Sequence, residues 1–242
     1  MTLRGFAHAL QFLTRLPAPR VDEFHPEDLS RSAVWFAAVG ALIGAILSVA
    51  LWTGLQLSPL VGALFALVMW VWVTGGLHLD GLGDVADALA AAHRSPERFL
   101  EVLRDPHIGA FGVMAIGLQL IAKLVLLAEL TTGPAVLALL LVPAWARWGT
   151  LLWSLAVPPL AGGTGERFSW QISRPLMVVQ GLVLALLSLW LAPVLLGALV
   201  VVPALAVYWK LRLGGITGDC LGASVEVTET VLLLLIAVAM TS

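Results

Sequence analysis

The chain has 242 residues, of which 60% are hydrophobic and only 12% are charged, and its mean hydropathy is +0.98. Soluble domains carry about 25% charged residues, so this composition excludes an ordinary soluble protein and indicates a polytopic membrane protein in the lipid bilayer. The net charge of −2 provides no basic field for nucleic acid, and the single cysteine, Cys220, excludes an internal disulfide.

The N-terminal segment, residues 1–32, carries mixed charge and does not resemble a cleaved signal peptide. Residues 3–15 place an apolar stripe on one side of a helix and polar side chains on the other, which predicts an amphipathic helix at the membrane interface. The stripe consists of Leu3, Phe6, Leu10 and Leu13. Pro17 ends this helix, and the polar residues 20–32 predict a surface loop.

Apolar runs long enough to cross a bilayer follow along the chain. The run at 176–209 is too long for one crossing, so we divide it near Ala192-Pro193. The predicted spans lie at about 33–55, 58–77, 109–130, 134–157, 176–192, 193–209 and 224–241. Gly40 and Gly44 form a GxxxG pair, which predicts a close helix–helix contact. We therefore predict an all-α transmembrane bundle of about seven spans that forms one domain, 1–242.

The distribution of basic residues predicts the orientation of this bundle. Eleven of the 13 Lys and Arg residues precede the first span or lie in three connections, at 78–108, 158–175 and 210–223. They are Arg4, Arg15, Arg20, Arg31, Arg94, Arg98, Arg104, Arg167, Arg174, Lys210 and Arg212. The positive-inside rule places these segments and the N-terminus in the cytoplasm. The polar segment 78–108 is then a cytoplasmic active-site loop.

Asp80, Asp84 and Asp87 form a polar cluster directly after the second apolar run. Their i, i+4, i+7 spacing places them on one face of a helix, and carboxylates so close together repel one another unless a cation lies among them. Hard oxygen ligands suit Mg²⁺ or Mn²⁺, so we predict a divalent-metal site rather than a solvated helix start. His78 lies two residues before Asp80, and its role is open. It could act as a base, a metal ligand or a phosphate contact, or it could be an interfacial histidine without a chemical role.

Two further segments carry residues suited to phosphate chemistry. Arg104 and His107 could bind phosphate, and Asp105 between them could join the metal site. Ser95 and Pro96, in contrast, indicate only an ordinary helix start. Residues 214–223 form a glycine-rich turn whose N–H groups could cradle phosphate, with Asp219 as a metal ligand or base.

Two basic residues fall within apolar spans, where charge is costly and usually faces the protein interior. We predict that Arg147 reaches the site. Lys123 either pairs with Glu129 or extends to the interface.

Four motifs in order along the chain resemble the cobalamin synthase family, the adenosylcobinamide-GDP ribazoletransferases. They are Phe-Leu-Thr-Arg-Leu-Pro at 12–17, Gly-Gly-Leu-His-Leu-Asp-Gly-Leu-Gly-Asp at 75–84, Arg-Asp-Pro-His-Ile-Gly-Ala-Phe-Gly at 104–112 and Gly-Gly-Ile-Thr-Gly-Asp at 214–219. His107 departs from the arginine expected there. The resemblance implies an inner-membrane, Mg²⁺-dependent enzyme of the last stage of vitamin B12 assembly, which joins adenosylcobinamide-GDP to α-ribazole, or its 5′-phosphate, and releases GMP.

Under this resemblance each candidate residue receives a role. Asp80, Asp84 and Asp87 would hold Mg²⁺, and His78 or Asp219 would act as the base. The residues expected to contact substrate are Arg15, Arg104, His107, Arg147 and Thr217. The alternatives are a CDP-alcohol phosphotransferase, whose Asp-Gly-x-x-Ala-Arg pattern is missing here, and an ion-coupled transporter, which would need acids at mid-membrane. The sequence leaves a homo-oligomer open.

Overall fold

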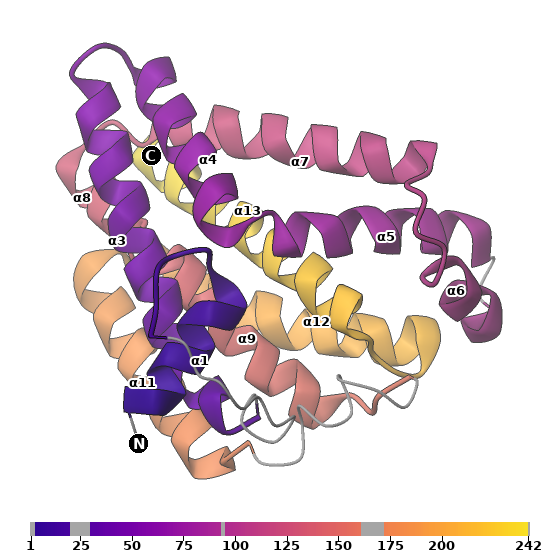
Figure 1. Ribbon diagram of the computed structural model, residues 1–242. Coiled ribbons are helices and arrows are strands. Elements are labelled where there is room, and N and C mark those ends of the chain that lie inside the picture. The colour runs from indigo at the N-terminus through magenta and orange to yellow at the C-terminus, as the bar shows by residue number, and fades with distance from the viewer. Residues whose placement is uncertain (1–2, 20–29, 93–94, 161–171, 242) are drawn as a thin grey trace.

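Helices form almost all of the described structure, which confirms the predicted all-α class (Figure 1). The computed structural model describes residues 3–19, 30–92, 95–160 and 172–241. Most of the loop predicted at 20–32, and the basic residues Arg20, Arg94 and Arg167 of the charge distribution, lie outside the described residues.

The first elements are α1 (Leu3–Leu13), the short 3₁₀ helix η1 (Ala33–Trp35) and α3 (Phe36–Leu55). The close contact predicted for Gly40 and Gly44 is confirmed. A Cβ atom on either residue would lie 2.7 Å from the Cα atom of Ala144 or Leu140, respectively. These partners belong to the region where α8 (Gly133–Ala138) leads into α9 (Val142–Ala156), so the two glycines let α3 pack against this backbone.

The helix after α3, α4 (Pro59–Thr74), begins at Ser58, whose hydroxyl accepts a hydrogen bond from the N–H of Val61. It ends earlier than the predicted span because Gly75 and Gly76 adopt positive φ angles of 65° and 73°. The chain then turns by 86° into α5 (Leu77–Ala92).

The segment between spans predicted at 78–108 contains α5 and α6 (Pro96–Val102), which agrees with the helical spacing of its aspartates. The predicted start of α6 is confirmed: Ser95 accepts a hydrogen bond from the N–H of Arg98 and Pro96 follows. The polarity of α5 excludes a conventional lipid-facing helix but not a helix that packs on protein, and α5 packs on α13.

The remaining elements are α7 (Ala110–Glu129), α8, α9, α11 (Arg174–Leu191), the 3₁₀ helix η2 (Pro193–Gly197), α12 (Ala198–Leu213) and α13 (Gly218–Thr241). The predicted division at Ala192-Pro193 is confirmed, since α11 ends just before it. The last helix begins at Gly218, earlier than the predicted 224, so half of the glycine-rich turn is helical.

The core lies around α9 and α13, where Trp145 and Trp153 are fully buried. Figure 1 shows α13 passing through the middle of the bundle, with α5 and α7 beside each other. Within the described residues, six helices are long and apolar enough to cross a membrane, or seven if the bent pair α4–α5 counts as one span. The number of spans agrees with the prediction, and the cytoplasmic orientation stays a prediction.

Candidate functional site

The three aspartates predicted to bind metal lie on α5, as their spacing required. Asp80 is exposed, and Asp84 and Asp87 are partly buried. Asp84 interacts electrostatically with Asp80 and Asp87 and also with Asp219, which lies in the first turn of α13. The structure thus brings together two acidic motifs that are far apart in the sequence.

Glycines at the contact between α5 and α13 position Asp219 near the α5 acids. A Cβ atom on Gly81 would lie 3.2 Å from the Cα atom of Asp219, and one on Gly222 would lie 3.4 Å from the Cα atom of His78. Any side chain at Gly81 would therefore push the start of α13 away from α5. Gly81 and Gly222 therefore allow the close approach of α5 and α13.

The turn before α13 is also held in place. Ile216 donates a hydrogen bond from its N–H to the carbonyl of Pro158 over 2.9 Å, and Leu160 donates to the carbonyl of Ile216 over 3.0 Å. Thr217 caps the helix, because its hydroxyl accepts a hydrogen bond from the N–H of Cys220 over 3.3 Å. Thr217 therefore has a local structural role beside its predicted contact with substrate.

Asp87 differs from the other two α5 aspartates because its carboxylate binds the start of α7. Its two oxygens accept hydrogen bonds from the backbone N–H groups of Gly109 over 2.7 Å and Gly112 over 2.9 Å. The first N–H groups of a helix have no partner within the helix, so a carboxylate there is favourable. Asp87 thereby fixes the start of α7 against α5.

Asp80 and Asp84 carry oxygen ligands of the kind that Mg²⁺ prefers, but the protein side chains alone do not form a complete coordination shell. Within the described ranges, no group of three or more His, Cys, Asp or Glu side chains is placed to hold a metal ion. Among the same residues, the carboxylates of Asp80 and Asp84 have no hydrogen-bond or ion-pair partner. Mg²⁺ is commonly held by one or two carboxylates together with water and substrate phosphates, and this donor set fits that mode. The metal role of Asp80, Asp84 and Asp87 stays a prediction.

An open cavity of about 630 Å³ lies beside Asp80, at the break between α4 and α5. Its lining includes Arg15, Gly75, Gly76 and Asp80. Arg15 is exposed and follows α1; its backbone N–H donates to the carbonyl of Val73 over 2.7 Å, and its guanidinium lies against Gly75. The cavity thus has a cation on one wall and a carboxylate on another, as a phosphate with a bound metal would require.

Arg104 and His107 lie on the exposed connection between α6 and α7. His107 contacts Asp105 over 2.7 Å from Nδ1 to Oδ1, and this side-chain hydrogen bond, with a second from the backbone N–H of His107, lowers the pKa of Asp105. The connection leads into Gly109, which Asp87 binds. Arg104 and His107 are therefore near the Asp87 end of α5, and their contact with substrate stays a prediction.

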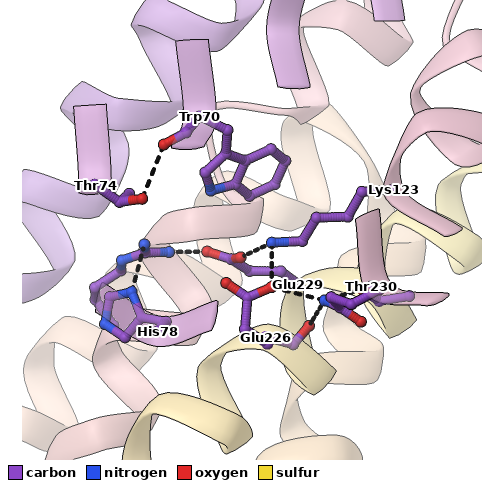
Figure 2. Close-up of polar contacts among 9 residues, drawn as sticks. Trp70, Thr74, His78, Lys123, Glu226, Glu229 and Thr230 are labelled. Carbon is purple, nitrogen blue, oxygen red and sulfur yellow. Dashed lines mark hydrogen bonds and ion pairs between the residues drawn. The ribbon is translucent and has the colours of Figure 1, made fainter. Parts of the chain in front are cut away.

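A buried network of charged side chains joins α7, α9 and α13 to His78 of α5 (Figure 2). The ammonium of Lys123 on α7 lies 2.7 Å from Glu226 and 2.6 Å from Glu229, both on α13. It also lies 4.2 Å from the ring centroid of Trp70. The predicted pairing of Lys123 with Glu129 is wrong, because tertiary packing turns Lys123 inward and leaves Glu129 exposed.

Arg147 of α9 belongs to the same network and is completely buried. Its guanidinium forms an ion pair with Glu229, and its Nη2 lies 3.4 Å from Nδ1 of His78. The described contacts of the Arg147 guanidinium are thus with protein side chains, and its predicted contact with substrate stays a prediction.

The pairing of Glu226 and Glu229 with buried cations was not predicted, nor was the role of Gln119, which donates to the Glu226 carboxylate over 2.7 Å. A signal for the two glutamates was present: Lys123 and Arg147 lie in apolar spans and required buried partners of opposite charge.

Comparison with known proteins identifies the family. Residues 5–237 match the family model described as cobalamin-5-phosphate synthase. A protein of Laribacter hongkongensis (strain HLHK9) named adenosylcobinamide-GDP ribazoletransferase is 54% identical to the chain, with 98% of each covered. A protein of the same name from Thiobacillus denitrificans (strain ATCC 25259 / T1) is 50% identical, with 98% of this chain and 96% of the relative covered.

A third such protein, from Novosphingobium aromaticivorans (strain ATCC 700278 / DSM 12444 / CCUG 56034 / CIP 105152 / NBRC 16084 / F199), is 47% identical over 98% of this chain and 97% of its own length. No solved structure matches the chain significantly. The family match and these relatives, each covered almost end to end, confirm the resemblance seen in the four motifs: the chain belongs to the cobalamin-5-phosphate synthase family.

Proposed function

We propose that the chain acts as an adenosylcobinamide-GDP ribazoletransferase, the enzyme for which its relatives are named, at the final step of cobalamin nucleotide-loop assembly. The support is the nearly full-length family match together with an acidic face beside an open cavity. The CDP-alcohol phosphotransferase and transporter alternatives have no comparable support.

In this reaction a hydroxyl oxygen of α-ribazole, or of its 5′-phosphate, attacks the phosphorus that carries cobinamide. The new P–O bond forms as the bond from that phosphorus to the bridging oxygen of the diphosphate breaks. GMP leaves with the bridging oxygen, and the hydroxyl proton passes to a base on the protein. Such transfers depend mainly on positioning and on neutralising phosphate charge.

The residues that would hold Mg²⁺ are Asp80 and Asp84, with Asp87 nearby. A bound Mg²⁺ would supply charge neutralisation on the diphosphate. Asp80 lines the cavity, so phosphate oxygens in the cavity could complete its coordination. Arg15 on the cavity wall would bind the diphosphate from the other side, and Arg104 and His107 would contact substrate at the far end of α5.

Of the two candidate bases, the contacts favour Asp219. A guanidinium only donates hydrogen bonds, so Nδ1 of His78 must accept from Arg147, and the ring proton then resides on Nε2. A nitrogen that already carries a proton is not a base. The Asp219 carboxylate is partly exposed and has no ion-pair partner among the described residues, so it is free to accept the hydroxyl proton.

The observation that carries this mechanism is the unpartnered state of Asp80 and Asp84 in the described structure. We would purify the protein in detergent, supply adenosylcobinamide-GDP, α-ribazole and Mg²⁺, and measure GMP release. Asp84→Asn should reduce turnover strongly or shift its Mg²⁺ dependence to higher concentration. Glu129→Gln is the matched control, because Glu129 is an exposed acid at the other end of α7.

Near-normal turnover of Asp84→Asn at low Mg²⁺ would refute the metal role. Asp219→Asn tests the base separately: turnover should fall roughly 10²- to 10⁴-fold, the usual contribution of general base catalysis, with an unchanged Mg²⁺ dependence. A normal turnover of Asp219→Asn would remove it from the mechanism and leave the metal proposal standing.

We also propose that the site faces the cytoplasm in the inner membrane. The support is the set of exposed basic residues in the segments predicted to be cytoplasmic. Arg4, Arg98 and Lys210 lie on α1, α6 and α12, and Arg15 and Arg104 lie on connections. A cysteine introduced at Arg104 should react with a membrane-impermeant maleimide in inverted vesicles and not in right-side-out ones. The opposite labelling pattern would reverse the orientation.

A further inference from the structure

The buried network connects side chains from four helices. Lys123, Arg147 and Glu229 come from α7, α9 and α13, and they lead to His78 on α5. Glu229 on α13 accepts from Lys123 on α7 and from Arg147 on α9, and Arg147 contacts His78 on α5. All four side chains are less than one-tenth exposed. Charged groups within membrane helices are costly and usually have a function.

Figure 2 shows how the imidazole of His78 is held. Nδ1 faces the guanidinium of Arg147 at 3.4 Å, and the other ring nitrogen, Nε2, points away from the network. Nε2 has no hydrogen-bond partner among the residues that the structure describes. A histidine whose Nδ1 accepts a hydrogen bond carries its proton on Nε2, so Nε2–H is a donor available to a ligand.

We propose that Glu229 is a positioning residue for the reaction. By holding Arg147, it fixes the orientation of His78, so that Nε2–H donates to a phosphate oxygen of the substrate. This inference rests on the proposed function and assigns His78 the role of a hydrogen-bond donor in place of a base. It also gives Glu229 a role in the reaction, although Glu229 is completely buried and touches no substrate.

Glu226 is the natural comparison for Glu229, because it lies one turn earlier on the same helix and is almost equally buried. Its carboxylate contacts Lys123 and Gln119. Its charge acts on Arg147 electrostatically, but among the described residues no hydrogen bond or ion pair joins it to Arg147 or His78. Both glutamates stabilise the same helix packing. Only Glu229 pairs directly with Arg147, the residue that contacts His78.

The test is a double-mutant cycle on GMP release, with purified full-length protein and saturating Mg²⁺. Glu229→Gln should lower kcat/KM roughly 10- to 100-fold, by analogy with the loss of partners that orient metal-ligating histidines. His78→Asn should also lower it, while leaving an amide oxygen near the position of Nδ1 to accept from Arg147. In the His78→Asn background, Glu229→Gln should have little further effect, because its pathway is already lost.

A purely structural role of Glu229 predicts a different result. The fold-loss caused by Glu229→Gln would then be the same with and without His78, within the roughly twofold precision of additive mutations, and that result would overturn the proposal. Full activity of His78→Asn would overturn it as well. Neither outcome affects the Asp84→Asn test, so failure of this inference is distinguishable from failure of the metal site.

Two further variants keep the test decisive. Glu226→Gln should lower stability and should be additive with His78→Asn. If Glu229→Gln does not fold, Arg147→Lys replaces it, since it keeps a positive charge opposite Glu229 but loses the planar guanidinium that reaches both partners. Arg147→Lys should lose activity only when His78 is present, and an equal loss in the His78→Asn background would refute the proposal.

Discussion

Asp87→Asn is the substitution that most directly separates structural from metal-binding roles on α5. The carboxylate accepts hydrogen bonds from the N–H groups of both Gly109 and Gly112. An amide keeps one accepting oxygen and replaces the other with an NH₂ group that faces an N–H donor. One N–H group at the start of α7 then loses its acceptor.

The size of the effect follows from these two contacts. A buried donor without a partner costs about 1–3 kcal/mol, and loss of the negative charge at the helix start adds about 0.3–1 kcal/mol. We therefore expect a loss of about 2 kcal/mol, at the lower end of the combined range because Asp87 is only partly buried. For a chain of this size that corresponds to a fall in Tm of about 4–8 °C.

The chain contains its own reporter for this assay. Cys220 is the only cysteine and is completely buried at the start of α13, so its thiol should react with a maleimide dye only on unfolding. Melting curves from this labelling would be compared for the wild type, Asp87→Asn and Asp80→Asn. Asp80 is exposed and accepts no hydrogen bond from the described residues, so its variant should keep the wild-type Tm and require more Mg²⁺ for activity.

An unchanged Tm for Asp87→Asn would refute the capping argument. A shift to higher Mg²⁺ requirement in that variant, without loss of stability, would return Asp87 to the metal site. An equal loss of Tm in Asp80→Asn would show that the aspartates stabilise α5 in some other way.

Two further predictions concern stability. Lys123→Met should lower the free energy of unfolding by about 3–5 kcal/mol, because it leaves buried glutamates without their cation; an unchanged thiol-labelling Tm would contradict the network. Gly40→Ala should cost about 1–3 kcal/mol by overpacking, since its Cβ would lie 2.7 Å from the Cα atom of Ala144. Gly117→Ala is the control, because no atom lies within 4 Å of a Cβ there, and equal melting of the two variants would refute the packing argument.

Local patterns in the sequence predicted much of the fold. Apolar runs located the spanning helices, and Gly40 with Gly44 located a close helix contact, because both are read directly from residue type and spacing. Ala192-Pro193 marked the boundary between two spans for the same reason. The spacing of the aspartates predicted a helix at α5, but it could not predict that α13 covers this helix, because that contact depends on tertiary packing.

The candidate site was predictable in its residue types and less so in its contacts. The face shared by Asp80, Asp84 and Asp87 follows from helical spacing. The hydrogen bonds of Asp87 to the start of α7 depend on how two helices pack side by side, which no local pattern specifies. The partners of Lys123 were missed for a related reason: Glu129 is near in sequence, whereas Glu226 and Glu229 are near only in the folded bundle.

The buried network also has a consequence for the order of membrane assembly. Lys123 and Arg147 belong to helices that are synthesised before α13, and α13 supplies both of the glutamates that pair with them. A basic residue at the centre of an inserting helix costs about 2.5–3.5 kcal/mol, so the earlier helices enter the bilayer with two uncompensated cations. The arrival of α13 completes the charge balance and makes this helix the closing step of assembly.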